Sequence, residues 1–316
     1  MNAVVFGGSG FLGSHVADAL TETGHKVIIF DLRHSPYLHS DQKMVIGDIL
    51  DMDKVFSAVE ACDVIYNFAG IADIDECAGK PIETVKYNIL GNSIILEAAR
   101  KAKTRRFVFA SSVYVYSNTG AFYRSSKQAC ESFIEDYHKL YGLPYTILRY
   151  GSLYGERADE RNSIHRLIKN ALLRGKIIYY GTGDEQREYI HVKDASALSV
   201  EILEPEFENQ HVILTGNRAM EYRNLLEMIQ EMLGNQVEIV YEEGERDAHY
   251  KVTPYTFNPK LGRKLVNNPH IDMGQGLLNC MKEIYEQIHQ EKHEEMGWLI
   301  HKGGEFENDR INKTYF

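Results

Sequence analysis

The sequence feature that most limits the fold is a glycine-rich segment near the start of the chain, Gly7-Gly8-Ser9-Gly10-Phe11-Leu12-Gly13. It directly follows an apolar run at residues 3–6 and opens a stretch with a helical pattern. Glycines in such a strand-to-helix turn let the backbone approach a pyrophosphate, whose charge the helix N-terminus stabilises. A plain tight turn uses the same residues, so the interpretation depends on the rest of the chain.

The second apolar run supplies that context, because residues 26–30 end in Asp31, which lies 31 − 13 = 18 positions beyond Gly13. A carboxylate there accepts hydrogen bonds from ribose hydroxyls and repels the extra phosphate of NADP. Asp31 could instead only cap its loop, and Arg33 could meet a 2′-phosphate. We expect NAD rather than NADP, with the adenine ring near Asp48 and Ile49 after the third run.

Short apolar runs alternate with helical patterns through the first two-thirds of the chain. This alternation predicts an α/β fold, a Rossmann-type doubly wound parallel sheet with a smaller C-terminal α/β substrate lobe. The predicted strands are residues 3–6, 26–30, 44–46, 64–68, 107–109 and 146–148, and the clearest helices are 82–103 and 125–140.

The rhythm changes after about Gly151. Two runs at 176–180 and 187–192 predict short strands joined by a turn, and helices are expected at 163–174, 224–233 and 277–290. We therefore expect an NAD-binding domain over residues 1–150, to which residues 188–214 return, and a substrate lobe over 151–187 and 215–290. Residues 291–316 are expected to be a loosely held polar extension.

Composition excludes several classes of protein. The 316 residues carry a formal charge of −10, which argues against nucleic acid as a partner, and no apolar run reaches the length of a membrane span. The N-terminus has no signal-peptide pattern, so we expect a cytoplasmic protein. The four cysteines form no Cys-x-x-Cys pair, and His289 and His293 are better explained by a solvated helix face than by a metal site.

Four motifs then occur in a fixed order: the glycine turn, Asn67-Phe68-Ala69-Gly70, Ser111-Ser112 and Tyr123-x-x-x-Lys127. With these motifs the chain resembles the extended short-chain dehydrogenase/reductase family, in particular its nucleotide-sugar epimerase/dehydratase branch, over residues 1 to about 290. The resemblance implies an NAD-dependent enzyme, with NAD tightly bound, that acts on a nucleotide-diphosphate sugar.

The Tyr-x-x-x-Lys spacing places Tyr123 and Lys127 on one face of a helix, one turn apart. A tyrosine hydroxyl has a pKa near 10, so a base at neutral pH needs about three units of lowering, or roughly 4 kcal/mol. The resemblance implies that Tyr123 is the general base, that Lys127 activates it and anchors a ribose, and that Ser112 donates a hydrogen bond to the reacting sugar oxygen. Taken alone, Tyr123 could be an ordinary surface tyrosine.

The resemblance also assigns residues to the two ligands. Asn88 is expected near NAD, although it could be a buried polar residue of a packed helix, and Ser152 stands where the family usually has asparagine. Arg187 is expected to grip the nucleotide diphosphate with its bidentate guanidinium, and Arg246 to assist it. The expected NAD contacts are Gly7, Gly10, Phe11, Leu12, Gly13, Asp31, Asp48, Ile49, Phe68, Ala69, Gly70, Asn88, Ser111, Tyr123, Lys127 and Tyr150. The expected substrate contacts are Ile71, Asp73, Tyr114, Ser152, Arg187 and Arg246.

Departures from the family pattern reduce the number of reactions that the chain is expected to catalyse. Related dehydratases, decarboxylases and reductase-epimerases carry acids or a cysteine just after the catalytic serine, where this chain has Val113 and Tyr114. Oxidation and reduction at one sugar carbon, most plausibly the 4-position, remains. A 4-epimerase is expected, with a 4-dehydrogenase that releases a keto-sugar as the alternative. An NAD(H)-sensing regulator on the same fold is the non-enzyme alternative.

Only 123 − 112 = 11 positions separate the serine from the tyrosine, about half the usual family spacing, and Arg124 replaces a common glycine. We expect a more open or differently shaped sugar pocket. The helices at 82–103 and 125–140 correspond to the pair through which family members dimerise as a four-helix bundle, so a homodimer is expected.

Overall fold

The computed structural model describes residues 1–242, 249–255, 262–268 and 270–300. Its centre is an eight-stranded sheet in the order β13-β10-β6-β5-β4-β1-β2-β3, in which every neighbouring pair is parallel. The chain leaves β1 toward one edge and then returns through β4 toward the other, which makes the sheet doubly wound, as predicted. The strands are β1 (Asn2–Phe6), β2 (Lys26–Asp31), β3 (Lys43–Ile46), β4 (Val64–Asn67), β5 (Arg106–Ser112), β6 (Tyr145–Tyr150), β10 (Gln210–Leu214) and β13 (Arg263–Leu265).

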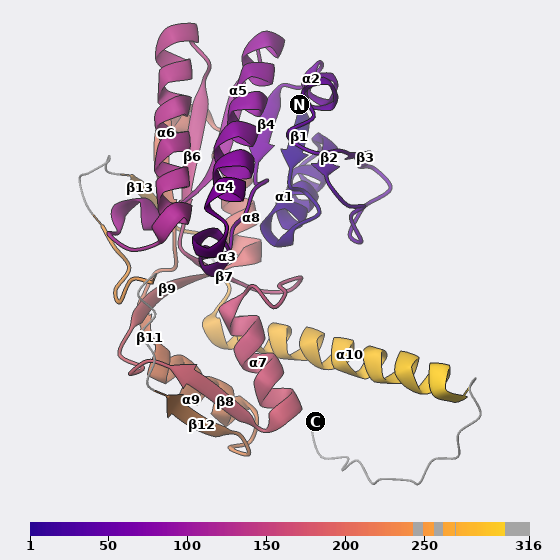
Figure 1. Cartoon of the computed structure of the whole chain (residues 1–316), viewed down its shortest axis with the longest axis vertical. Coiled ribbons are helices and arrows are strands. Elements are labelled where there is room, and N and C mark those ends of the chain that lie inside the picture. Colours follow the sequence, from indigo (N-terminus) through magenta and orange to yellow (C-terminus); the bar gives the residue numbers. More distant parts are fainter. Residues whose placement is uncertain (243–248, 256–261, 269, 301–316) are drawn as a thin grey trace.

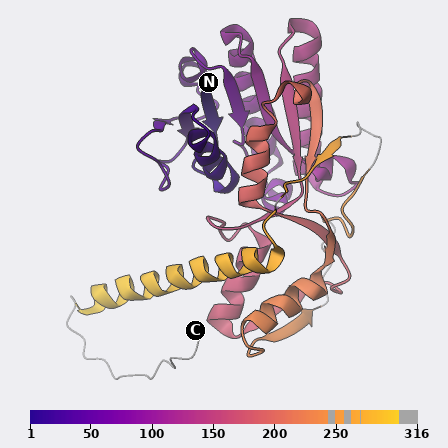
Figure 2. The same cartoon turned by 180° about the vertical axis from the view of Figure 1, so that it is seen from behind.

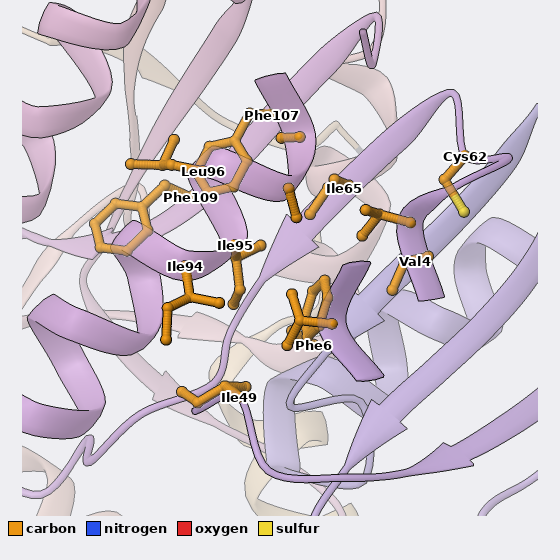
Figure 3. Packing of buried hydrophobic residues seen from close by; sticks show 14 of the residues in the cluster. Val4, Phe6, Ile49, Cys62, Ile65, Ile94, Ile95, Leu96, Phe107 and Phe109 are labelled. Atoms are coloured by element: carbon orange, nitrogen blue, oxygen red, sulfur yellow. The ribbon is translucent and has the colours of Figure 1, made fainter. Parts of the chain in front are cut away.

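Helices cover both faces of this sheet. Alternate strand residues point to opposite sides, so Val4 and Phe6 enter one core while Ala3 and Val5 enter the other. The first core packs under α2 (Met52–Val59), α5 (Gly91–Ala102) and α6 (Ala121–Tyr141) (Figure 3). The second packs under α1 (Phe11–Glu22) and α8 (Val192–Glu201), which lie in front of the sheet in the rear view of Figure 2. Burial on both faces explains why these strands are continuously apolar.

The predicted helix at 82–103 exists but changes its winding along its length. It consists of α4 (Pro81–Thr84), a π-helical segment η1 (Val85–Leu90) and α5, and it follows the short helix α3 (Ile74–Gly79). Such π-turns are rare and are frequent at functional sites. The buried Asn88 lies in this one.

A second, smaller lobe lies below the carboxyl edge of the sheet in Figure 1. Its core packs three helices, α7 (Ser163–Arg174), α9 (Tyr222–Met232) and α10 (Met273–Ile300), against short strands. Those strands are β7 (Ser152–Tyr154), β8 (Lys176–Tyr180), β9 (Gln186–His191), β11 (Ala219–Glu221) and β12 (Glu238–Glu242). The short helices η2 (Val113–Tyr116) and η3 (Pro205–Phe207) complete the described elements.

The two predicted lobe strands, β8 and β9, do not pair with each other. β8 pairs with β12, and β9 lies between β11 and β7. The Glu185 carboxylate explains the separation, because it accepts the backbone N–H groups of Thr182 and Gly183 and holds the intervening residues as a loop.

The C-terminal prediction needs a correction. The helix expected at 277–290 runs from Met273 to Ile300, so residues 291–300 continue it instead of forming a loose extension. Residues 301–316 lie outside the described residues. In the described part of the chain, no helix combines the length and apolar character of a membrane span.

Candidate active site

The glycine turn lies at the carboxyl edge of the sheet, between β1 and α1. Its glycines permit very close packing: a Cβ on Gly13 would lie 2.2 Å from the Gly7 carbonyl oxygen, and one on Gly7 would lie 2.7 Å from the Ala69 nitrogen. Gly7 also has a positive φ of 77°. Gly10 is the N-cap of α1, and among the described residues no side chain caps this helix. The first N–H groups of α1 can therefore bind a diphosphate, as NAD requires.

Asp31 ends β2 beside this turn and helps to fix its shape. One carboxylate oxygen accepts the Ser9 backbone N–H at 3.0 Å, and the other accepts that of Arg33 at 3.3 Å. The Ser9 hydroxyl donates to the Arg33 carbonyl at 2.9 Å. A negative side chain next to the phosphate cradle suits a ribose diol and disfavours a 2′-phosphate, so the residues present fit NAD.

Asn88 ties the cofactor edge of the sheet to the π-helical segment. Its side-chain oxygen accepts the Ile71 N–H at 2.7 Å, and its amide donates to the Ile71 carbonyl and to the Ser126 hydroxyl, each at 3.0 Å. A Cβ on Gly70 would lie 2.6 Å from the same oxygen. The asparagine thus holds residues 70 and 71 against α6.

The structure brings the expected catalytic trio together. The Ser112 hydroxyl donates to the Tyr123 oxygen, and the Lys127 ammonium lies 5.7 Å from the centre of the Tyr123 ring. Lys127 donates to the Ala110 carbonyl at 2.7 Å, which holds it under the end of β5. Burial raises the pKa of Tyr123 to about 12, against the lowering effect of Ser112, and burial lowers the pKa of Lys127. These shifts mean that the tyrosine needs an added positive charge before it can act as a base.

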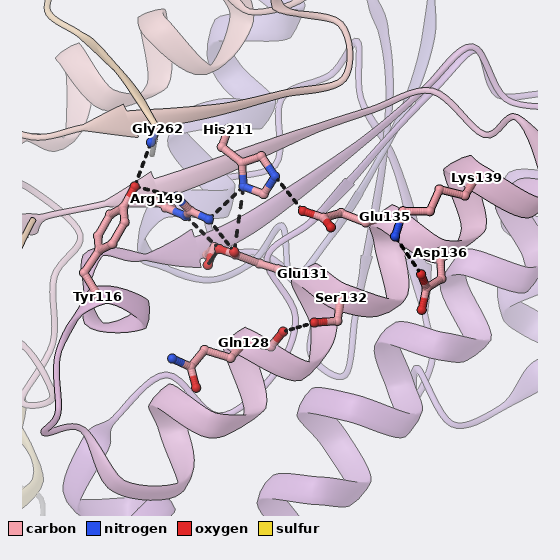
Figure 4. Close-up of polar contacts among 11 residues, drawn as sticks. Tyr116, Gln128, Glu131, Ser132, Glu135, Asp136, Lys139, Arg149, His211 and Gly262 are labelled. Carbon is pink, nitrogen blue, oxygen red and sulfur yellow. Dashed lines mark hydrogen bonds and ion pairs between the residues drawn. The ribbon is translucent and has the colours of Figure 1, made fainter. Parts of the chain in front are cut away.

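A buried polar network anchors the helix that carries the trio (Figure 4). Glu131, one turn beyond Lys127 on α6, accepts two hydrogen bonds from Arg149 of β6, at 3.0 and 2.6 Å, and one from the Ser111 hydroxyl at 2.6 Å. Arg149 also contacts Tyr116 and His211 of β10. Because Ser111 precedes Ser112, the network fixes α6 and the end of β5 relative to each other.

Aromatic side chains from several segments gather beside Tyr123, where the sugar is expected. The Tyr114 ring meets the Tyr123 ring edge-on at 6.1 Å and the Tyr250 ring at 4.5 Å. The Arg187 guanidinium of β9 lies 4.2 Å from the centre of the Tyr250 ring and is buried. The Tyr250 hydroxyl shares a hydrogen bond with Ser152 of β7. The expected substrate residues Tyr114, Ser152 and Arg187 are thus joined through Tyr250.

Three expected ligand residues direct their side chains elsewhere. The Tyr150 hydroxyl contacts Ser199 of α8 at 2.6 Å, Ser111 is engaged by Glu131, and Asp73 caps α3 by accepting the Glu76 N–H at 2.7 Å.

Two further expected NAD contacts, Asp48 and Phe68, lie at the edge of the sheet that carries the glycine turn. Asp48 accepts the Leu50 N–H at 2.9 Å, and the Phe68 ring lies 6.0 Å from that of Tyr66. Arg246 and the side chain of His293 lie outside the described residues, and His289 contacts the Tyr285 carbonyl at 2.9 Å.

Comparisons with known proteins agree with this arrangement. A model described as "NAD dependent epimerase/dehydratase family" matches residues 3–214. A putative UDP-glucose 4-epimerase of Methanocaldococcus jannaschii is 29% identical over 88% of this chain and 98% of its own length. A UDP-N-acetyl-alpha-D-glucosaminuronate decarboxylase of Bacillus cytotoxicus is 28% identical over 90% and 97%. The crystal structure of UDP-glucose 4-epimerase from Thermotoga maritima has a TM-score of 0.80 at 23% identity and covers 91% of this chain and 100% of that one.

Fold and site define a Rossmann-type enzyme of the extended short-chain dehydrogenase/reductase class that uses NAD. The chain belongs to the NAD-dependent epimerase/dehydratase family.

Sequence reasoning missed Glu131 and the two aromatic residues His249 and Tyr250. Glu131 could have been found, because Tyr123, Lys127 and Glu131 are spaced four apart and share one helix face. Residues 249 and 250 carry no local motif, and only the tertiary fold brings them to Tyr114.

Proposed function

We propose that the protein is a nucleotide-sugar 4-epimerase, which oxidises carbon 4 of a nucleotide-diphosphate sugar and reduces the resulting ketone from its other face. One observation carries the proposal: the trio is assembled, and neither residue after Ser112 is a carboxylic acid or a cysteine. Val113 is only 1% exposed and packs among Val115, Tyr116, Ile213 and Tyr250. Burial raises the pKa of Tyr114 well above its usual value, so its hydroxyl stays protonated.

The chain's own residues supply proton transfer and orientation. Ser112 and Tyr123 hold the sugar hydroxyl, and Tyr123 takes its proton during oxidation and returns it during reduction. The glycine turn and Asp31 would hold NAD, which when bound would supply the hydride acceptor and donor and a positive charge that favours the tyrosinate. The buried Lys127 ammonium stabilises the tyrosinate, which offsets the burial that raises the Tyr123 pKa to about 12.

Arg187 is the proposed diphosphate ligand of the substrate lobe. The Arg187 side chain donates to the carbonyls of Gln186 at 2.8 Å and Lys251 at 3.3 Å, and its planar group packs against Tyr250. A guanidinium fixed in this way keeps further donors for phosphate oxygens with little loss of side-chain entropy on binding.

The names of several similar proteins agree with an epimerase. The Methanocaldococcus relative is called a putative UDP-glucose 4-epimerase, and a UDP-glucuronic acid 4-epimerase of Bacillus cereus has a TM-score of 0.80 at 21% identity. Relatives named as decarboxylase or dehydratase also occur. Elimination of water needs an additional acid and base pair; Val113 has no titratable group, and burial raises the pKa of Tyr114, which disfavours its action as a base.

A panel of UDP-, GDP- and dTDP-sugars, followed by absorbance at 340 nm and by product stereochemistry, tests the proposal. Inversion at carbon 4 without net NADH is the expected result. Accumulation of NADH with a keto-sugar would identify a 4-dehydrogenase instead. Stable NADH binding without turnover of any sugar would identify a regulator.

We also propose a homodimer that packs the helices after β4 and β5 against their copies. Their outer surfaces expose large apolar side chains, with Val85 at 53%, Leu90 at 50% and Phe133 at 45%. Such neighbouring residues are typical of an interface. Light scattering at micromolar concentration should give twice the chain mass, and Phe133→Glu should halve it, whereas a monomeric wild type would refute the proposal.

A further inference from the structure

Residues 249–255 connect the smaller lobe to η2 and α3 of the sheet domain. Two backbone contacts tie this segment to β9: Gln186 N–H donates to the Lys251 carbonyl at 2.7 Å, and Glu188 N–H donates to the Thr253 hydroxyl at 3.2 Å. The Tyr255 hydroxyl donates to Glu188 at 2.6 Å. Because β9 belongs to the lobe, the lobe holds this segment in place.

The first residue of the segment, His249, contacts two elements of the sheet domain. Its Nδ1 lies 2.9 Å from the Tyr114 hydroxyl, and its Nε2 lies 3.7 Å from the Asp75 carboxylate on α3. Tyr114 belongs to η2, which directly follows Ser112, whereas α3 follows β4. The His249 imidazole therefore connects the lobe to the segments that follow β4 and β5.

Tyr114 fills the space left by the short connection between Ser112 and Tyr123. A Cβ on Gly120, which has a φ of 98°, would lie 2.7 Å from a Tyr114 ring carbon. The loop is thus wrapped closely around the ring, whose edge meets Tyr123 at 6.1 Å. The short spacing therefore places the Tyr114 ring directly beside the expected base.

We propose that His249 is a positioning residue: by holding Tyr114 beside Tyr123 it closes the sugar end of the site and retains the keto-sugar until hydride returns. The proposal rests on the 4-epimerase function. An epimerase must keep its ketone long enough for the sugar to turn, and a closed wall slows its escape without touching the reacting atoms. Separation of His249 from Tyr114 is the opening step.

Three variants separate this role from a general loss of folding. His249→Ala and Tyr114→Phe both remove the 2.9 Å contact, whereas His249→Gln keeps a hydrogen-bonding partner for Tyr114. His270→Ala is the matched control, because His270 is an exposed histidine that contacts Asn217, away from Tyr114. The His249 side chain is 26% exposed, and thermal unfolding should confirm that its variants fold.

The first measurement is the ratio of released keto-sugar to epimerised product after the protein has been removed by filtration. Each released keto-sugar leaves one NADH on the protein, so the amount of bound NADH is measured as a check. His249→Ala and Tyr114→Phe should raise this ratio about three- to tenfold, the effect of one lost hydrogen bond, with little change in NAD affinity. His249→Gln and His270→Ala should stay close to the wild type. An unchanged ratio in both His249→Ala and Tyr114→Phe would overturn the proposal.

The second measurement is independent of turnover. In a Tyr123→Phe background, the dissociation rates of labelled UDP-, GDP- and dTDP-glucose are compared with and without His249→Ala. Faster dissociation of the sugar nucleotide that binds supports the closing role even if the wild type proves to be a dehydrogenase. An unchanged rate overturns that role while leaving epimerisation intact, and absence of binding by all three overturns both proposals.

Discussion

The cofactor half and the sugar half of the site are built in different ways. The expected cofactor half comes from the ends of two neighbouring strands, at Gly7 after β1 and Asp31 of β2, within one parallel sheet. The sugar half joins η2, β7, β9 and residues 249–255, which are far apart in sequence. Chemistry common to a family can therefore be fixed by local geometry, while the substrate pocket depends on how distant segments meet.

Replacement of Tyr123 by Phe should have the largest effect, because this residue serves both halves. It removes the proposed acid and base but keeps the ring, so kcat should fall about 10²- to 10⁴-fold. NAD affinity and the dissociation rate of the sugar nucleotide should change little. Tyr180→Phe, at a residue 43% exposed on the lobe, is the control. Full activity of Tyr123→Phe would refute its assigned role.

The buried network beneath the trio should be the next most sensitive feature. Glu131→Gln removes the negative partner of Arg149, whose side chain is 0% exposed, and should lower the free energy of unfolding by about 3–5 kcal/mol. Urea denaturation measures this change. Asp136→Asn on the same helix breaks an exposed pair with Lys139 and should cost less than about 1 kcal/mol. Equal losses in the two variants would show that the network does not anchor α6.

The contrast between the two halves also explains what sequence could predict. The first six strands of the sheet, the glycine turn and the Tyr123–Lys127 spacing follow from short-range patterns, and each occurs in the structure, whereas β10 and β13 of the same sheet were not predicted. The position of Tyr250 against Arg187 depends on the packing of two distant segments, which no local pattern encodes. Tyr150 lies at the end of β6, beyond the predicted strand at 146–148, and its hydroxyl contacts Ser199 of α8, a pairing that no local pattern indicates.

Asp31→Asn should affect the cofactor half alone. Loss of the charge weakens both the ribose contacts and the grip on the Ser9 N–H, so NAD affinity should fall about ten- to a hundredfold. NADP binding should weaken less or improve, because the repulsion of its phosphate is lost. Calorimetric titration with each dinucleotide measures the two affinities, and an equal loss for both would contradict the assigned discrimination.

Tyr250→Phe should have the smallest effect and should stay within the sugar half. It removes the hydroxyl that Ser152 shares but leaves the ring against Arg187 and Tyr114. One neutral hydrogen bond contributes about 0.5–1.5 kcal/mol of binding free energy. Its loss should therefore raise KM for the sugar nucleotide about two- to tenfold, while NAD affinity stays nearly constant. Steady-state kinetics with saturating NAD measure this. A parallel loss of NAD affinity would mean that the two halves are coupled through Tyr114 and Tyr123, since their rings are the direct contact between them.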